Sequence, residues 1–278
     1  MKLRSIGLTI ALAGVTSAGT YFVSHSTAQQ TAPAVNNDYQ LGATLYMQKS
    51  GEYRALAYQA FNIARWQLDA DLDKKNVKRL PKDEQKRPRA IMVDIDETVL
   101  DNSPAQARGI VDHRGFELNA WYAWGDMRKA KAIPGAVEFL NYAVSKGVKI
   151  FYVSNRDEVQ KKATIDNLRS VGFNDISDDN VMLRDKDSSK EARRGIILQK
   201  YRIVFFMGDN LDDHSAVFEK RSVADRFAET DKAKDLFGKR YIMLPNAMYG
   251  TWENAIYDYG RLTESQKAEK RLNALELP

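Results

Sequence analysis

The sequence contains no cysteine and three histidines among its 278 residues. Without cysteine the chain can form no disulfide, thiolate nucleophile or thiolate-bound zinc site, and it offers no thiol for a lipid anchor. His25, His113 and His214 are too few and too scattered for a zinc site or a Ser-His pair. Gly-x-Ser-x-Gly and P-loop patterns are also missing, which excludes esterases with that motif and P-loop nucleotide hydrolases. Stability must come from packing.

Long hydrophobic runs are absent beyond the first residues of the chain. At the start, Lys2 and Arg4 precede an apolar stretch without acidic residues, and small residues follow up to Ala28. This layout predicts a secretory signal peptide over residues 1–28 and a periplasmic or secreted protein. An uncleaved membrane anchor is the alternative, because Ile6 to Val23 is nearly long enough to span a bilayer.

An excess of charge of one sign is also lacking. The formal net charge is +5, and removal of Lys2 and Arg4 with the signal lowers it to +3. This mild excess suits anionic small molecules but not nucleic acid, because the basic residues are dispersed among acidic ones. The basic stretch at 82–89 has the composition of a solvated linker. With 44% hydrophobic residues, the chain can bury one substantial core and a small accessory lobe.

The pattern of hydrophobic residues predicts the element order. A flexible tether is expected at 29–38, helices over 39–73 and a C-terminal helix within 261–278. Short apolar runs typical of buried parallel strands lie at 90–96, 148–154, 181–183, 203–209 and 241–244, and helical stretches between them lie at 134–146, 158–170 and 188–200. Strands that alternate with helices predict an α/β fold, a doubly wound parallel sheet.

Polar residues collect where three of these strands end. In such sheets, ligands bind at the carboxyl ends of the strands, so these residues are expected to form one site. They are Asp94 and Asp96 after the first strand, Ser154, Asn155 and Arg156 after the second, and Asp209 and Asp213 after the fourth.

Two aspartates separated by one residue place like charge at the tip of the first strand. Burial of this charge is costly unless a cation is present, and Mg²⁺ prefers such hard oxygen ligands. Asp209 is the best candidate for a further ligand, with Asp213 holding a metal-bound water or Lys190. Taken alone, Asp94 and Asp96 could instead form a calcium loop or a helix cap.

Four ordered motifs together carry a family resemblance. They are Val93 to Leu100 (VDIDETVL), Val153 to Arg156 (VSNR), Lys190, and Gly208 to Asp213 (GDNLDD). This set resembles the haloacid dehalogenase superfamily. Three segments resemble those of bacterial class C acid phosphatases, and in particular those of the outer-membrane lipoprotein 5′-nucleotidases. They are DETVLDNS at 96–103, AIPGA at 132–136 and LPNAMYGTWE at 244–253.

The resemblance implies a domain over 39–260 with a haloacid dehalogenase-like core and a small, mainly helical accessory lobe from about 39–80 and 101–133. It implies a Mg²⁺-dependent acid phosphatase in which Asp94 is the nucleophile and Asp96 the general acid and base, with the Asp96 backbone carbonyl as a metal ligand. Ser154 and Asn155 would donate hydrogen bonds to the phosphoryl group, and Lys190 would bridge it to Asp94. It also suggests a homodimer.

Two basic positions leave a choice open at this stage. Lys190 matches the family's pattern at a helix start better than Lys186, although its loop could be an ordinary solvated face. Arg156 fits a structural ion pair as well as a role in phosphate binding.

Five aromatic residues are expected in loops beside the site, namely Trp121, Tyr122, Trp124, Tyr249 and Trp252. Family members sandwich a nucleotide base between aromatic rings, and Trp121 and Tyr249 are the positions that look similar; packing of the accessory lobe is the alternative role. The resemblance therefore favours a nucleoside 5′-monophosphate as the small-molecule substrate. The alternatives are a broad phosphomonoesterase for aryl or sugar phosphates and a non-catalytic envelope binding protein. The missing cysteine departs from the lipoprotein relatives and argues against lipid anchoring.

Overall fold

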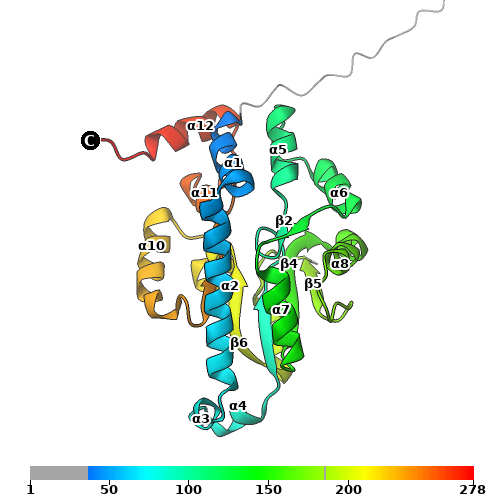
Figure 1. The fold of residues 1–278 in the computed structure, drawn as a ribbon. Coiled ribbons are helices and arrows are strands. Elements are labelled where there is room, and N and C mark those ends of the chain that lie inside the picture. The colour runs from blue at the N-terminus through cyan, green and yellow to red at the C-terminus, as the bar shows by residue number, and fades with distance from the viewer. Residues whose placement is uncertain (1–36, 185) are drawn as a thin grey trace, which may run out of the picture. The chain divides into compact units, whose positions relative to one another are not determined.

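The computed structural model describes residues 37–184 and 186–278, so the predicted signal peptide and most of the predicted tether lie outside the described residues. Five parallel strands form the central sheet in the order β5-β4-β1-β6-β7. They are β1 (Arg89–Val93), β4 (Lys149–Asp157), β5 (Val181–Arg184), β6 (Arg202–Gly208) and β7 (Tyr241–Met243). Figure 1 labels β4, β5 and β6 of this sheet. The predicted parallel α/β sheet is confirmed.

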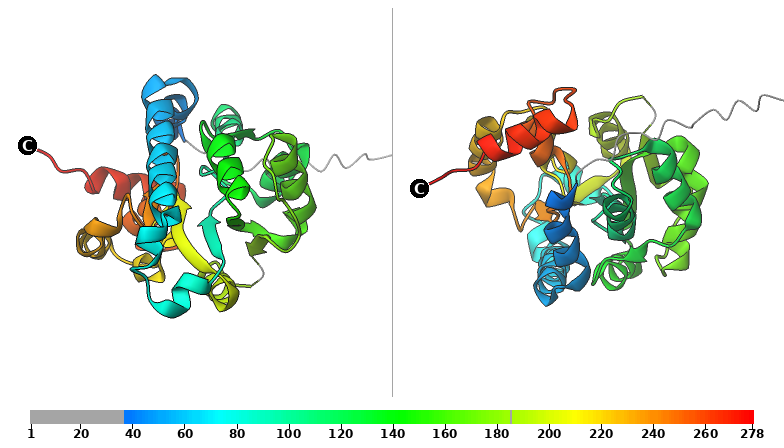
Figure 2. Two further views of the ribbon diagram at one scale, coloured as in Figure 1. Left: turned by 60° about the horizontal axis from the view of Figure 1, so that its bottom comes forward. Right: turned by 90° about the horizontal axis from the view of Figure 1, so that it is seen from above.

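Two hydrophobic clusters cover the two faces of the sheet, and successive side chains of β1 belong alternately to one cluster and the other. Ile91 and Val93 belong to the larger cluster with α2 (Gly51–Leu72), α7 (Ala136–Ser145) and α8 (Lys161–Ser170). Ala90 and Met92 belong to the other cluster, which includes Ile197 of α9 (Glu191–Lys200). Since successive side chains of a strand point to opposite faces, the sheet is covered on both sides. Figure 2 shows α2 and α7 side by side over one face, where they are in contact.

The predicted N-terminal helical region consists of two helices. The helix α1 (Leu41–Lys49) ends at Ser50, which has extended backbone, and the Ser50 hydroxyl accepts the Tyr53 backbone N–H at 3.0 Å at the start of α2. Such an N-cap satisfies one of the helix's free donors. The C-terminal helix α12 (Glu264–Asn273) likewise begins at a capping box formed by Thr263 and Gln266.

The insertion after β1 is mainly helical. It contains α5 (Ser103–Val111) and α6 (Leu118–Met127), and a short antiparallel pair, β2 (Leu100–Asp101) with β3 (Lys131–Ala132), closes its base. The expectation that Trp121, Tyr122 and Trp124 lie in loops was wrong, because all three lie on α6. This helix is short, and three aromatic residues and a glycine hide its periodicity. Trp252 was also expected in a loop, but it lies on α11 (Thr251–Ile256).

Short helices connect α2 to β1 at the far end of the sheet. They are α3 (Lys74–Val77) and α4 (Lys82–Lys86), and α4 lies within the predicted basic linker at 82–89. Near them, the carboxylate of Asp71 accepts hydrogen bonds from Arg89 at 2.6 Å and from both terminal nitrogens of Arg202 at 2.7 Å. These bonds fasten the end of α2 to the starts of β1 and β6.

The remaining described helices complete the surface. They are α10 (Val223–Lys232) and α11 (Thr251–Ile256), with short 3-10 turns between them and elsewhere. Among the residues that the structure describes, no helix has both the length and the hydropathy that a membrane crossing requires.

Candidate active site

Asp94 is fixed directly beyond the end of β1. Its backbone N–H donates to the Met207 carbonyl of β6 at 2.9 Å, which continues the pairing of the two strands by one residue. Beyond Asp94 the chain leaves the sheet and turns at Glu97, whose φ is 55°. Asp94 and Asp96 therefore meet different partners, although regular alternation would have pointed them the same way.

Lys190 lies between two carboxylates at the carboxyl end of the sheet. Its Nζ donates to Asp94 Oδ1 and lies 2.6 Å from Asp213 Oδ1, and all three side chains are less than 10% exposed. Lys186, the other candidate in the preceding loop, is exposed. Burial alone would lower the pKa of Lys190, but the charges of Asp213 and Asp94 outweigh it and raise the pKa. Lys190 is thus held as a cation beside Asp94.

Asp209 occupies the end of β6. Its Oδ2 accepts the side-chain amides of Asn246 at 2.7 Å and Asn210 at 2.9 Å. Asp213 is held by the Asn210 backbone N–H at 3.0 Å. Gly208 allows this close approach, because a Cβ there would lie 2.3 Å from the Asp213 side chain. The sequence reasoning missed Asn246, although it follows the fifth predicted strand.

The carboxylates of Asp94, Asp209 and Asp213 each offer an oxygen, and these three oxygens lie within 4.8 Å of one another. Burial raises the pKa of Asp94 to about 7, and Asp213 and Asp96 add to this effect against the opposing charge of Lys190. Burial also raises the pKa of Asp209, together with the charges of Asp213 and Asp94. Fully ionised, the three carboxylates and Lys190 leave two negative charges, which a divalent cation would balance. Hard, buried oxygen donors fit such an ion.

Asp96 is held by three donors on the other side of the site. Arg156 donates from Nη2 at 2.7 Å and Nε at 2.9 Å, the Asn102 amide donates at 2.8 Å, and the Ser154 hydroxyl donates at 3.1 Å. Arg156 is buried, and its guanidinium also reaches the Thr164 hydroxyl at 3.2 Å. Of the two alternatives for Arg156, the structure shows the ion pair.

Asn155 is exposed, but its side-chain oxygen accepts a hydrogen bond from Arg193 at 2.7 Å. The same guanidinium donates to the Ser154 carbonyl at 2.6 Å. Arg193 therefore fixes the last residues of β4, where the sequence predicted that the strand had already ended. The amide nitrogen of Asn155 is not used in this contact with Arg193. Sequence reasoning missed Arg193, although it lies one helical turn after Lys190.

The two aromatic candidates come from different elements. Trp121 is half-buried on α6, with its ring centroid 5.4 Å from the Arg156 guanidinium carbon. Tyr249 lies just before α11, is half-buried and packs against the main hydrophobic cluster. Tyr122 of α6 donates from its hydroxyl to Asp157 at 2.6 Å, so its side chain reaches the end of β4.

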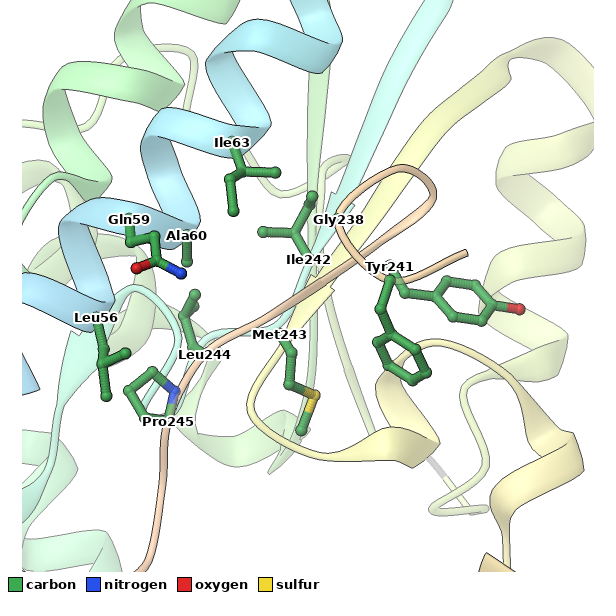
Figure 3. A pocket seen from close by; sticks show the side chains of 11 residues that line it. Leu56, Gln59, Ala60, Ile63, Gly238, Tyr241, Ile242, Met243, Leu244 and Pro245 are labelled. Carbon is green, nitrogen blue, oxygen red and sulfur yellow. The ribbon is translucent and has the colours of Figure 1, made fainter. Parts of the chain in front are cut away.

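An apolar pocket of about 290 Å³ lies between α2 and the segment around β7 (Figure 3). Its lining contains no charged residue and none of the carboxylates described above. Phosphate chemistry therefore belongs to the carboxylate cluster and not to this pocket.

Comparison with known proteins matches residues 11–252 to a family model of the HAD superfamily, subfamily IIIB (acid phosphatase). The chain belongs to this acid phosphatase family. The class C acid phosphatase of Bacillus anthracis has a solved structure that is 40% identical and superposes with a TM-score of 0.80, covering 86% of this chain and 98% of that one. A second structure of that protein, with tungstate bound, matches equally well.

The chain is also similar to Acid phosphatase 1 of Solanum lycopersicum, with 28% identity over 132 residues. The match spans about half of that relative, 49% of its length. The predicted family, the haloacid dehalogenase-like fold and the phosphatase class are confirmed. Phosphatases of the HAD superfamily use a divalent metal, and the buried aspartates 94, 209 and 213 could hold one.

Proposed function

We propose that this chain is a secreted, Mg²⁺-dependent acid phosphatase that hydrolyses small-molecule phosphate monoesters, nucleoside 5′-monophosphates in particular, through an aspartyl phosphate on Asp94. The observation that carries the proposal is the buried cluster of Asp94, Lys190, Asp209 and Asp213 at the carboxyl end of the sheet. Packed apolar residues often stabilise a fold as well as a buried group of charged residues does. A buried cluster of charged side chains therefore favours a catalytic role over a purely structural one.

The metal would be held by Asp94, the Asp96 backbone carbonyl and Asp209, with Asp213 close enough to contribute. When bound, Mg²⁺ would offset the charge of the phosphoryl oxygens. Lys190 would supply further positive charge at Asp94, since its Nζ already contacts that carboxylate.

In the first step, a carboxylate oxygen of Asp94 attacks phosphorus in line, and the bond from phosphorus to the leaving oxygen breaks. Asp96 donates its proton to that oxygen. In the second step, Asp96 takes a proton from water, which attacks the phosphorus of the aspartyl phosphate and releases inorganic phosphate with Asp94 restored. Ser154 and Asn155 would donate hydrogen bonds to the phosphoryl group during both steps.

The nucleotide substrate rests on Trp121 and Tyr249, which would stack on the base. Stacking of this kind contributes about 1–3 kcal/mol per base and tolerates different bases. Tungstate, which the relative from Bacillus anthracis binds, is a tetrahedral oxyanion like phosphate, so its binding supports a phosphate-sized site in the shared fold. The proposal that the protein is secreted rests on the N-terminal sequence. A homodimer is also proposed, and it rests on the family resemblance.

The test is hydrolysis of p-nitrophenyl phosphate and a set of nucleoside monophosphates at pH 5–6, with Mg²⁺ and with chelator. Asp94→Asn is compared with wild type and with Asp179→Asn, which changes an exposed aspartate. We expect metal-dependent turnover that only the Asp94 variant loses. Turnover that survives in Asp94→Asn would refute the nucleophile. Trp121→Ala and Tyr249→Ala should raise KM for nucleotides alone; an equal rise for p-nitrophenyl phosphate would refute base stacking.

A further inference from the structure

Two tryptophans of α6 contact the groups that hold Asp96. Trp124 donates its indole N–H to Asn102 Oδ1 at 2.8 Å, and the ring of Trp121 lies 5.4 Å from the Arg156 guanidinium carbon. Asn102 and Arg156 in turn donate to Asp96. The accessory helix α6 is therefore connected to the Asp96 carboxylate twice, once through the side chain of Asn102 and once through that of Arg156.

The Asn102 amide has a defined orientation in this arrangement. Its oxygen accepts from Trp124 and, at 3.2 Å, from Arg156, so its nitrogen faces Asp96 Oδ1 at 2.8 Å. An asparagine amide rotated by 180° would present its oxygen to the Asp96 carboxylate and its nitrogen to two donors, which is repulsive on both sides. Asn102 is 1% exposed, so solvent does not compete for these bonds.

We propose that Trp124 is a positioning residue for proton transfer at Asp96 and acts through Asn102. The proposal rests on the assignment of Asp96 as general acid under the proposed function. An alkoxide leaving group needs the proton that Asp96 donates, whereas p-nitrophenolate leaves with little help. Loss of the correct Asp96 geometry therefore lowers the rate for alkyl phosphates more than for aryl phosphates.

The experiment compares kcat/KM for glycerol phosphate with kcat/KM for p-nitrophenyl phosphate, because kcat/KM reports the step in which the leaving group departs. Trp124→Phe keeps an aromatic ring and removes the N–H donor. One hydrogen bond corresponds to a factor of about 3 to 10, so the alkyl-to-aryl ratio of kcat/KM should fall by that factor. Trp66→Phe, which changes an indole that is 66% exposed on α2, should leave the ratio unchanged.

Asp96→Asn separates this proposal from the one it rests on. If Asp96→Asn lowers the alkyl-to-aryl ratio and Trp124→Phe does not, the role of Trp124 is refuted and the assignment of Asp96 stands. If Asp96→Asn lowers both rates equally, the assignment of Asp96 is refuted, and the role of Trp124 with it.

Asn102→Ala tests the route even where Trp124→Phe is too unstable to assay. It removes the donor to Asp96 without changing the indole, and the ratio should again fall. In the Asn102→Ala background, Trp124→Phe should cause no further fall in the ratio, because the two residues act through one path. An unchanged ratio in Asn102→Ala, or additive effects in the double variant, would overturn the proposal.

Discussion

Replacement of Lys190 by methionine tests the charge balance of the buried cluster most directly. The substitution keeps an unbranched side chain of similar length and removes the cation between Asp94 and Asp213. With chelator present, the carboxylates of Asp94 and Asp213 then have no cation between them. The side chains at positions 94, 190 and 213 are all less than 10% exposed, so water screens this charge poorly. Removal of one partner from such a buried pair costs about 3–5 kcal/mol.

The expected cost lies at the lower end of this range. Lys190 lowers the pKa of Asp94, which is about 7 in its presence, so the variant can relieve the repulsion by binding a proton at Asp94. We therefore expect a loss of about 3 kcal/mol in chelator, or about 6–12 °C in Tm for a domain of this size. Mg²⁺ should restore more stability to the variant than to wild type, because a divalent ion substitutes for the missing charge.

Urea unfolding with chelator and with Mg²⁺ measures this difference, and p-nitrophenyl phosphate hydrolysis measures the catalytic effect. A loss of about 10²–10³ in kcat is expected, as for other preorganised groups that stabilise transition-state charge. Lys186→Met, which changes the exposed lysine four residues earlier, is the matched control. If both variants lose similar activity or stability, the cluster does not depend on Lys190 and the reasoning fails.

Three further predictions concern Asp71 at the far end of the sheet, Arg193 beside the site, and the metal. Asp71→Asn should cost about 3–5 kcal/mol at pH 7, because it leaves Arg89 and Arg202 without their carboxylate. Burial would raise the pKa of Asp71, but hydrogen bonds from Arg202 and Arg89 outweigh it and lower the pKa below its ordinary value. The stabilisation is therefore present above about pH 4 and is lost as the pH falls through the pKa of the folded state. The free energies of unfolding of wild type and variant, measured in urea, should converge at low pH, and a constant difference between them would contradict the prediction. Arg193→Ala should lower kcat/KM for aryl and alkyl phosphates alike by about tenfold or more, because Asn155 loses its charged donor, and Arg193→Lys should recover part of the loss. Chelation should abolish turnover, and added Mg²⁺ should raise the stability of wild type by about 2.7 kcal/mol at 100 times its Kd; a Tm that ignores Mg²⁺ would speak against the metal site.

The sequence was sufficient to predict the core of the fold and the edge where the site lies. Each central strand is a short apolar run, and three of these runs end in Asp94, Ser154 and Asp209, which the parallel sheet brings to one edge. The order of these motifs also indicated the family. This information is local along the chain, so no knowledge of tertiary contacts was needed.

The contacts that orient these residues could not be predicted in the same way. Arg193 and Trp124 donate hydrogen bonds to side chains that are distant in sequence, Asn155 and Asn102, and such bonds leave no periodic pattern. The sequence could not decide the partner of Arg156 for the same reason, since a guanidinium near the end of a strand can bind a carboxylate or a phosphate. The structure shows that the partner is the Asp96 carboxylate. The region of α6 was expected to be mainly helical, but its aromatic residues were expected in loops, because the short length of the helix and those aromatic residues hide an amphipathic pattern.

The two aspartates of the Asp-x-Asp motif are thus supported by different parts of the molecule. Asp94 is held by the sheet and by Lys190, whereas Asp96 is held by Arg156, Ser154 and, through Asn102, by the accessory helix α6. Since Asp94 forms the bond to phosphorus and Asp96 moves the proton in the proposed reaction, changes around Asp94 should affect all phosphate esters equally. Changes at the contact between Trp124 of α6 and Asn102 should instead alter how strongly the rate depends on the leaving group. The dependence of the rate on the leaving group therefore distinguishes the residues that support Asp96 from those that support Asp94.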